Sequence, residues 1–329
     1  MIKKINIKTL KNFLYLIKGF YYANSYSFNP QKKSNIIKKI EEKIKKKTKL
    51  NINQYLDQYK SISEIKIEDV NIDYKKENFI IKLSNDIFHD IEIKVSNNNS
   101  DNNKVLIYLP GYKTGSDNVT LNKNHPEYLL DFAKKNQLTL VTWDWPLHGK
   151  RLNNCLFKNI NSIYNAEKEY SKILNLLGSS LFIEYIHEYK FILNILTCLF
   201  VNKKIINVGY SMGGFFSYFA PLLNKNIYKT ISISSFNSYL NLFKDEKIKV
   251  NGQFYYPYNA INYFEMEDII IDANKKTVQP LHVIFGDKDP NCNVEMKNNP
   301  LFKDLSINVL KNHGHEFSTD IIKVLKNAL

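Results

Sequence analysis

Cysteine and arginine are scarce in this chain, and each shortage narrows what the protein can be. Three of the 329 residues are cysteine, at Cys155, Cys198 and Cys292. An odd number of widely spaced cysteines does not support a disulfide framework or a zinc module, so we expect a reducing compartment, the cytoplasm. Arginine occurs once, at Arg151, which argues against specific readout of nucleic-acid bases. We therefore expect no nucleic-acid partner.

Long apolar runs are missing as well. No segment reaches the roughly 18 apolar residues of a membrane-spanning helix. The longest candidate, Phe191–Val201, has the length of a core helix and contains Asn194. The chain starts with several lysines, as a signal peptide does, but Lys18 interrupts the short apolar stretch Phe13–Ile17. The sequence thus predicts neither a membrane span nor a well-formed signal peptide.

Positive charge is confined to one end of the chain. Residues 1–50 hold 14 lysines against two acids, a net +12, so the rest of the chain carries only +2 of the total +14. Apolar residues recur at helical spacing between the lysines in residues 1–23 and 34–47, which predicts two basic amphipathic helices. We favour a helical extension packed on the body with solvated lysines. Weak contact of residues 1–50 with an anionic membrane surface is the alternative.

The rest of the chain predicts an α/β fold. Between Ile65 and Val95 apolar and charged residues alternate, which indicates an antiparallel opening meander with one wet face. Short apolar runs then alternate with helical patterns, which is typical of a parallel sheet flanked by helices. The strands are expected at Val105–Leu109, Leu138–Asp144, Ile205–Val208, Thr230–Ser235, Leu281–Phe285 and Ser306–Leu310.

Two parts and two long connections follow from this pattern. We expect residues 1–60 to form the basic helical extension and residues 61–329 to form one α/β domain. Residues 152–203 are longer than the usual strand–helix–strand link and mainly helical, with helices expected at 164–177 and 181–201. Residues 237–279 are rich in aromatic side chains. Either connection is a candidate lid or pocket wall, although simple packing explains the aromatic residues equally well.

The most specific motif is Gly-Tyr-Ser-Met-Gly at residues 209–213, which fits Gly-x-Ser-x-Gly. A short apolar strand precedes it, and a helical pattern follows over Met212–Leu223, with a break expected near its end at Pro221. A strand, a sharp turn and a helix are the context of a nucleophile elbow. In such a turn a strained backbone pushes the Ser211 hydroxyl into open space.

Glycine itself marks the edge of the predicted sheet. Gly209 and Gly213 lie two positions either side of Ser211, where a tight turn leaves no room for side chains. Only 11 glycines occur in the chain, and eight of them follow predicted strands. Since the carboxyl ends of parallel strands share one edge, these turns gather where sites of open α/β sheets form. The eight are Gly111, Gly115, Gly149, Gly209, Gly213, Gly214, Gly286 and Gly314.

A serine nucleophile needs a base, and the base needs an orienting carboxylate. Asp289 follows one predicted strand and His315 follows the last one, which gives the chain order serine, acid, histidine expected for this elbow. We predict that Ser211 attacks a carbonyl, that His315 takes and returns the proton, and that Asp289 orients the imidazole. The backbone amides of Met212 and Tyr112 are the predicted oxyanion donors.

At this point the sequence resembles an α/β-hydrolase of the serine esterase type, over about residues 65–329. The elbow motif at 209–214 matches that of the family. Leu-Pro-Gly-Tyr at 109–112 resembles the family's His-Gly-x oxyanion turn. Pro110 replaces the usual histidine, which leaves the backbone donor in place because the resemblance assigns that role to Tyr112.

Three further turns carry the resemblance. Gly-Asp-Lys-Asp at 286–289 resembles the acid turn, whose last residue is the acid. Asn-His-Gly-His at 312–315 resembles the histidine turn, whose last residue is the base. The stretch 144–151 resembles a turn common in bacterial carboxylesterases and related peptidase-like hydrolases. We expect His148 and Arg151 of this turn to be structural, with contact between Arg151 and a substrate carboxylate as the alternative.

Some assignments stay open at this stage. Asp287 is the alternative to Asp289 as the acid, and His313 is the alternative to His315 as the base. A metal site at His313-x-His315-Glu316 lacks a third ligand at useful spacing, so we expect no metal.

The function predicted from these residues is that of a serine hydrolase, most directly a carboxylesterase. It would cleave a small or medium carboxylic ester through an acyl-enzyme intermediate, without a cofactor. A thioesterase, an acyltransferase or a peptidase on the same triad is the alternative within enzymes. A non-catalytic binding module of the same fold is the alternative outside them.

Overall fold

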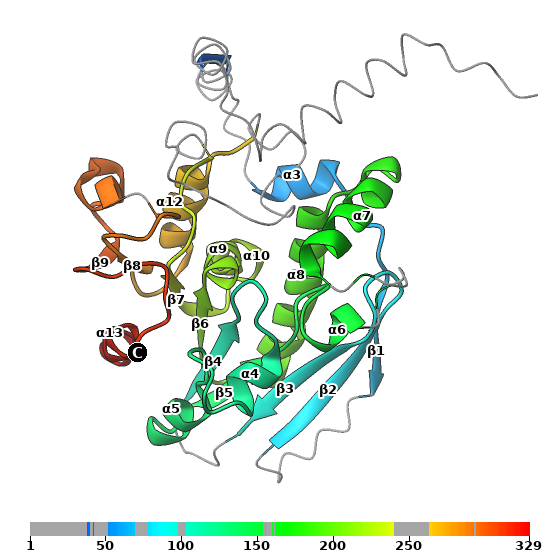
Figure 1. The fold of residues 1–329 in the computed structure, drawn as a ribbon, viewed down its shortest axis with the longest axis horizontal. Coiled ribbons are helices and arrows are strands. Elements are labelled where there is room, and N and C mark those ends of the chain that lie inside the picture. Colours follow the sequence, from blue (N-terminus) through cyan, green and yellow to red (C-terminus); the bar gives the residue numbers. More distant parts are fainter. Residues whose placement is uncertain are drawn as a thin grey trace, which may run out of the picture.

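The computed structural model describes residues 52–69, 78–97, 103–153, 155, 160, 162–239, 263–292 and 294–329, together with 38, 39 and 42. Within these residues, nine strands form one mixed sheet in the order β1-β2-β3-β5-β4-β6-β7-β8-β9. Figure 1 shows this sheet running through the molecule with helices on both sides. The α/β class predicted from the sequence is therefore confirmed.

The opening meander is present as expected. Strands β1 (Ile65–Asp69), β2 (Asn78–Asn85) and β3 (Ile91–Ser96) pair antiparallel with one another. Along β2, exposed and buried side chains alternate over most of the strand, because successive residues point to opposite faces of a sheet. The positions expected at Val70 and Ile72 lie outside the described residues.

The remaining strands run parallel and share one carboxyl edge. They are β4 (Lys104–Leu109), β5 (Thr139–Thr142), β6 (Lys204–Tyr210), β7 (Ile227–Ile233), β8 (His282–Gly286) and β9 (Ser306–Leu310). Neighbours among them pair in parallel, and only the β3–β5 contact joins them antiparallel to the meander. The turns after these six strands therefore meet at one edge of the sheet.

Both faces of the parallel sheet are covered by apolar side chains. Alternate residues of β4 join different clusters, with Ile107 in one and Leu106 in the other. The first cluster lies under α8 (Leu181–Leu199), α9 (Met212–Ser217), α10 (Ala220–Leu223) and α12 (Met266–Lys276). The second lies under α5 (Leu130–Lys135) and α13 (Thr319–Ala328). This double burial explains why the strands read as continuous apolar runs.

The helix after the elbow breaks earlier than the sequence analysis predicted. Helix α9 ends at Ser217, and α10 starts at Ala220 with proline in its first turn. The proline ring of Pro221 has no N–H and clashes with the carbonyl four residues earlier, which is that of Ser217. Proline is well tolerated in the first turn of a helix. Pro221 therefore lies in the first turn of the second helix, and the break falls just before this proline instead of at it.

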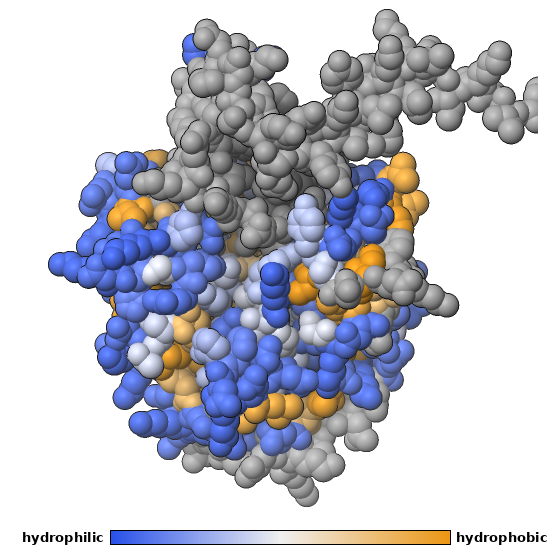
Figure 2. Space-filling view, in the orientation of Figure 1, coloured by the Kyte–Doolittle hydropathy of each residue, from blue (hydrophilic) through white to orange (hydrophobic). Residues whose placement is uncertain are grey.

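The helices expected between β5 and β6 are present as α7 (Ile163–Leu176) and α8. Ser162 and Ser180 cap their N-termini through side-chain oxygens that accept from backbone amides. Figure 2 shows a mainly hydrophilic described surface, with hydrophobic residues gathered in a few places, one of them over the end of α7. Leu176 and Leu177 are exposed there. Of the aromatic connection 237–279, residues 240–262 lie outside the described residues.

Short helices complete the described chain: α3 (Ile52–Gln58), α4 (Ser116–Thr120), α6 (Lys150–Asn153), and the 3₁₀ turns η3 (Val294–Asn298) and η4 (Pro300–Phe302). In α3, the Tyr55 ring is buried and packs edge-on against Phe182 and Phe264. The amphipathic pattern of residues 1–23, and nearly all of that over 34–47, lies outside the described residues. None of the described helices is both long and apolar enough to cross a bilayer.

Candidate functional site

Ser211 stands directly after β6, in the sharp turn that leads into α9. Its backbone has φ 52° and ψ −111°, a strained combination for a residue with a side chain. The Ser211 amide donates to the Ile233 carbonyl over 2.8 Å, which ties the turn to the end of β7. A Cβ atom added at Gly213 would overlap the Leu109 carbonyl. Glycine therefore lets α9 begin in contact with the end of β4.

Two further side chains from the same sheet edge reach Ser211. The Nε2 atom of His315, after β9, lies 2.8 Å from the Ser211 hydroxyl oxygen. The Nδ1 atom of the same ring lies 2.9 and 3.0 Å from the two carboxylate oxygens of Asp289, after β8. These distances are those of hydrogen bonds. Three residues separated by up to 104 positions in the chain thus form one connected polar line.

The tautomer of His315 follows from its partners. An ionised carboxylate only accepts hydrogen bonds, so the Nδ1 atom facing Asp289 carries the proton. The other ring nitrogen, Nε2, is then unprotonated and accepts from the Ser211 hydroxyl. The Asp289 side chain is fully buried, whereas a quarter of the His315 side chain is exposed. The His315 ring is therefore accessible from solvent, whereas Asp289 is shielded from water.

Tyr210 holds the histidine ring from the side. Its ring stacks on that of His315 with centroids 5.5 Å apart and planes at 28°. Its hydroxyl donates to the His315 backbone carbonyl over 3.3 Å. Phe317 packs edge-on against the same tyrosine ring. Burial raises the pKa of Tyr210 above its usual value, so the hydroxyl remains a neutral donor.

Cys292 is a thiol close to the acid but not a competing nucleophile. Its sulfur donates to the Ser235 carbonyl over 3.2 Å, and the side chain is buried. Burial, together with the neighbouring Asp289 carboxylate, raises the pKa of the thiol. Since only the thiolate is strongly nucleophilic, the Cys292 thiol stays unreactive in this position.

The two expected oxyanion donors lie in turns that follow neighbouring strands of the sheet. Met212 is the first residue of α9, where backbone N–H groups have no acceptor within the helix. Tyr112 lies three residues after the end of β4. Strands β4 and β6 pair in parallel up to Leu109 and Gly209. The loop after β4 and the elbow after β6 therefore leave the sheet edge side by side.

The structure distinguishes the open alternatives by geometry. Asp289 contacts His315, whereas the Asp287 side chain is exposed. His313 turns elsewhere, since its Nε2 atom lies 3.2 Å from an Asp320 oxygen in α13. Across the described ranges, no group of three or more histidine, cysteine, aspartate or glutamate side chains is placed to hold a metal ion.

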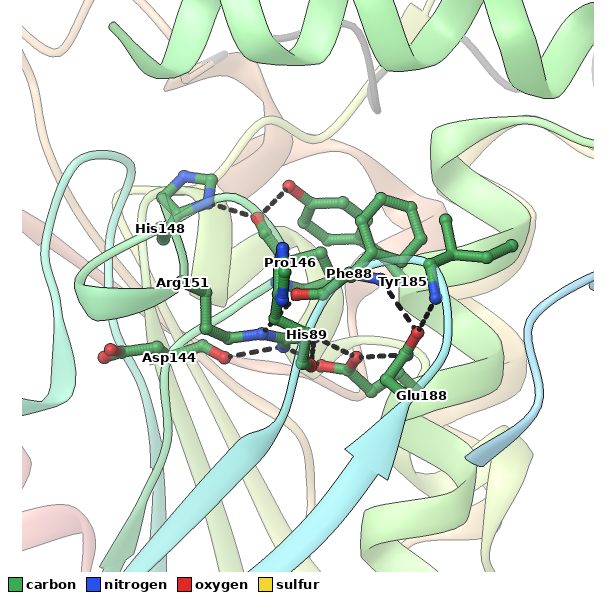
Figure 3. A network of polar contacts seen from close by, with 10 residues as sticks. Phe88, His89, Asp144, Pro146, His148, Arg151, Tyr185 and Glu188 are labelled. Carbon is green, nitrogen blue, oxygen red and sulfur yellow. Dashed lines mark hydrogen bonds and ion pairs between the residues drawn. The ribbon is translucent and has the colours of Figure 1, made fainter. Parts of the chain in front are cut away.

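Arg151 belongs to a buried network of polar contacts that joins the turn after β5 to α8 (Figure 3). Its guanidinium lies 2.6 and 2.9 Å from the two oxygens of Glu188 in α8. The remaining N–H groups donate to the backbone carbonyls of Phe88, His89 and Asp144 over 3.1 to 3.2 Å. Both charged side chains are almost completely buried. This arrangement supports the structural interpretation of Arg151 over contact with a substrate carboxylate.

The His148 side chain also forms a hydrogen bond within this turn. Its Nδ1 atom donates to the Pro146 carbonyl over 2.7 Å, and the Tyr185 hydroxyl donates to the same oxygen over 2.6 Å. Burial lowers the pKa of His148 to about 4. The ring is therefore neutral at physiological pH and fixes the turn rather than carrying charge.

Replacing Arg151 by methionine should destabilise the protein strongly. The Glu188 carboxylate would remain buried without its cation, which typically costs about 3–5 kcal/mol. Urea unfolding of the Arg151→Met variant measures this loss in the free energy of unfolding. The control is Lys172→Met, which breaks the exposed pair with Glu169 and should cost less than about 0.5 kcal/mol. Equal losses in the two variants would contradict the prediction.

Three residues that contact the candidate site or the loop beside it were not found from the sequence. Tyr210 occupies a variable position of the elbow motif. The Asn291 side chain lies 3.2 Å from His315 Nδ1. Glu127 is buried behind the loop that carries Tyr112. No local pattern marks these residues, because each makes its contact with a residue more than ten positions away in the chain.

Comparisons with known proteins found similar solved structures but no similar sequence. No protein-family model matches the sequence, and no curated protein matches it by sequence. A solved structure from Bacteroides fragilis NCTC 9343, assigned provisionally as an acetyl xylan esterase, is similar over 92% of this chain and 90% of its own, with TM-score 0.56 and 14% identity. Acetyl xylan esterase 1 from Thermoanaerobacterium sp. JW/SL YS485 covers 92% of this chain and 98% of its own, with TM-score 0.49 and 12% identity.

The first of these similarities, together with the sheet order and the elbow, defines the class of fold. The chain has the α/β-hydrolase fold. The mixed sheet with antiparallel opening strands and flanking helices agrees with the fold that the sequence motifs predicted.

Proposed function

We propose that the chain is a serine hydrolase that cleaves a small or medium carboxylic ester through an acyl-enzyme intermediate. The observation that carries this proposal is the hydrogen-bonded line from Ser211 through His315 to Asp289, with 2.8 Å at the serine and 2.9 Å at the acid. A serine hydroxyl is a weak nucleophile unless a base within hydrogen-bond reach takes its proton. The elbow conformation of Ser211 adds support, because it exposes the hydroxyl at the sheet edge.

The chemistry follows from these contacts. The Ser211 oxygen attacks the ester carbonyl carbon while its proton moves to Nε2 of His315. Asp289 stabilises the imidazolium that forms. The carbonyl oxygen becomes an oxyanion, which accepts hydrogen bonds from the Met212 and Tyr112 amides. The alcohol then leaves with the proton from Nε2, and a water molecule, activated by the same histidine, hydrolyses the acyl-enzyme and frees Ser211.

The name of one structural neighbour is consistent with an ester as the substrate. The Bacteroides fragilis protein is assigned provisionally as an acetyl xylan esterase. We extend the ester class, and not the sugar part of that name, to this chain.

The experiment that tests the proposal uses the full-length protein and p-nitrophenyl esters of increasing acyl length. We expect hydrolysis with a burst of about one p-nitrophenol per protein molecule where deacylation is slow, since an acyl-enzyme accumulates. A fluorophosphonate probe should label the protein. Thioester and anilide analogues of the best acyl group then separate the esterase from thioesterase and peptidase activities. A folded protein with neither hydrolysis nor labelling would contradict the proposal and favour a binding module.

A further inference from the structure

A buried carboxylate, that of Glu127, lies next to the loop that carries Tyr112. Glu127, between α4 and α5, is only 3% exposed. Its oxygens accept three hydrogen bonds, from the Tyr108 hydroxyl over 2.8 Å, the Gly111 amide over 2.9 Å and the Thr114 hydroxyl over 2.6 Å. Burial raises the pKa of Glu127, and these three donors oppose that shift. The loop therefore supplies donors that stabilise the buried carboxylate, and the carboxylate in turn stabilises the conformation of the loop.

Two of the three donors lie at the two ends of one tight turn. The Gly111 carbonyl accepts from the Thr114 amide over 3.1 Å, so residues 111–114 form a hydrogen-bonded turn. Within it Lys113 has φ 71°, a left-handed conformation that persists only where the surroundings enforce it. The Glu127 carboxylate accepts from the backbone amide of the first residue of this turn, Gly111, and from the side-chain hydroxyl of its last residue, Thr114. These two hydrogen bonds thus stabilise the strained conformation of the turn.

The direction of the Tyr112 amide follows from the same turn. The Gly111 carbonyl and the Tyr112 N–H belong to one peptide group, and in a planar trans peptide they point in opposite directions. The described residues contain no cis peptide bond. Because the Gly111 carbonyl points towards the Thr114 amide, the Tyr112 N–H points away from it. Fixing the turn therefore fixes the direction in which Tyr112 can donate.

Other contacts hold the residues beside the turn. The Trp145 indole donates to the Pro110 carbonyl over 3.3 Å, and the Tyr112 hydroxyl donates to Glu167 over 3.2 Å. The Ser116 amide donates to Asp144 over 2.5 Å. These contacts fix where the loop leaves and rejoins its neighbours. Glu127 differs from them because it bonds to both ends of the turn that contains the Tyr112 peptide group.

We propose that Glu127 is a positioning residue, which orients the Tyr112 amide towards the developing oxyanion through the 111–114 turn. This inference depends on the proposed hydrolase function. Glu127 acts through Tyr112 and does not touch the reacting atoms. Its removal should therefore weaken the stabilisation of the transition state more than the binding of substrate.

The test compares Glu127→Ala, Glu127→Asp and Glu127→Gln. Removing an oxyanion donor lowers kcat by about 10²- to 10³-fold in other enzymes, so a misdirected donor should cost about 10- to 100-fold in Glu127→Ala. The KM should change little. Affinity for a trifluoromethyl ketone, whose adduct places an oxyanion at the same position, should weaken in parallel. The pH at which kcat reaches half its maximum should stay the same, because Asp289 and His315 are untouched.

The conservative variants test whether Glu127 acts by positioning the turn through hydrogen bonds or only by filling the space beside it. Glutamine can accept from Tyr108 and Gly111 with its oxygen and donate to the Thr114 hydroxyl with its nitrogen, so Glu127→Gln should keep kcat within about threefold. Aspartate keeps the charge but is one methylene shorter, and it cannot reach both ends of the turn. Glu127→Asp should therefore lose kcat, and it decides the question if Glu127→Ala does not fold.

Glu184→Ala is the matched control. Glu184 is also a buried carboxylate with several donors, the Ser61 and Ser179 hydroxyls and the Ile62 and Ser63 amides, in a different part of the fold. We expect lower thermal stability in this variant with unchanged kcat per folded molecule. Wild-type kcat in folded Glu127→Ala or Glu127→Asp would overturn the inference, as would a loss confined to KM. Failure of the wild type itself to hydrolyse or label would instead overturn the proposed function.

Discussion

Ser211→Ala should lower kcat/KM for p-nitrophenyl acetate by about 10⁴- to 10⁶-fold, the range seen when the nucleophile of such a triad is removed. The alanine side chain cannot form the acyl-enzyme, whereas the oxyanion donors and the binding surface remain. The fluorophosphonate probe should no longer label the protein. Thermal unfolding should change little, because only one hydroxyl, hydrogen-bonded to a partly exposed His315, is removed.

Ser234→Ala is a closely matched control for this substitution. Ser234 also follows a parallel strand, β7, next to the strand before the elbow, and its φ of 48° is close to the 52° of Ser211. Its side-chain oxygen is buried and has no hydrogen-bond partner within the described structure. Alanine at Ser234 should therefore keep activity within about twofold, since the substitution breaks no side-chain hydrogen bond and removes a buried polar group without a partner. A similar loss in both variants would indicate damage to the sheet edge rather than removal of a nucleophile.

Much of this fold could be predicted from the sequence because both periodicities are strong. The meander alternates apolar and polar residues, since one of its faces is wet, whereas β4 to β8 are buried on both faces. The elbow was recognisable because close backbone contacts require its glycines: Gly209 faces Gly213 within the turn, and Gly213 faces Leu109 at the end of β4. Helix boundaries were harder. Helix α9 ends at Ser217 because the Pro221 ring would clash with the Ser217 carbonyl. The proline thus acts on a residue one helical turn before it in the chain.

Spacing alone predicted only the chain order of the candidate site, and the preference for Asp289 and His315 came from the family resemblance of their turns. Spacing could not choose between Asp287 and Asp289, nor between His313 and His315, because each pair lies in one turn after a strand. The direction of a side chain in such a turn is set by backbone hydrogen bonds, here from the Asp289 amide to the Gly286 carbonyl and from the Lys288 amide to the His313 carbonyl. The second of these bonds joins two separate loops, and no local pattern encodes it.

The residues that support the site escaped prediction for a related reason. Tyr210, at the end of β6, contacts His315 in the loop after β9, and Glu127 contacts residues 13 to 19 positions earlier in the connection after β4. Contacts of this kind form only in the folded protein, where the strand ends and their connections come together at one edge of the sheet. The strained conformations of Lys113 and Ser211, at φ 71° and 52°, stand on this edge, where surrounding hydrogen bonds enforce them. A rigid sheet with strained turns at its carboxyl edge is therefore the common physical basis of the fold and the proposed chemistry.

His315→Gln should reduce kcat by about 10⁵- to 10⁶-fold, as expected when the base of a serine triad is lost. Glutamine has nearly the length of histidine but cannot take a proton from Ser211 near neutral pH. The Ser211 hydroxyl would remain in place as an unactivated nucleophile, and fluorophosphonate labelling should become very slow. The measurement is single-turnover acylation, which follows the chemical step directly.

His313→Gln supplies the control, two residues away in the same turn. Its ring faces Asp320 at 3.2 Å and the start of α13 rather than Ser211, so acylation should stay within about threefold of the wild type, the range of ordinary surface changes. If His313→Gln lost activity and His315→Gln kept it, the base would be misassigned. Equal and large losses in both would mean that the turn after β9 acts as a unit, in which the His313 contact with α13 holds His315 against Ser211.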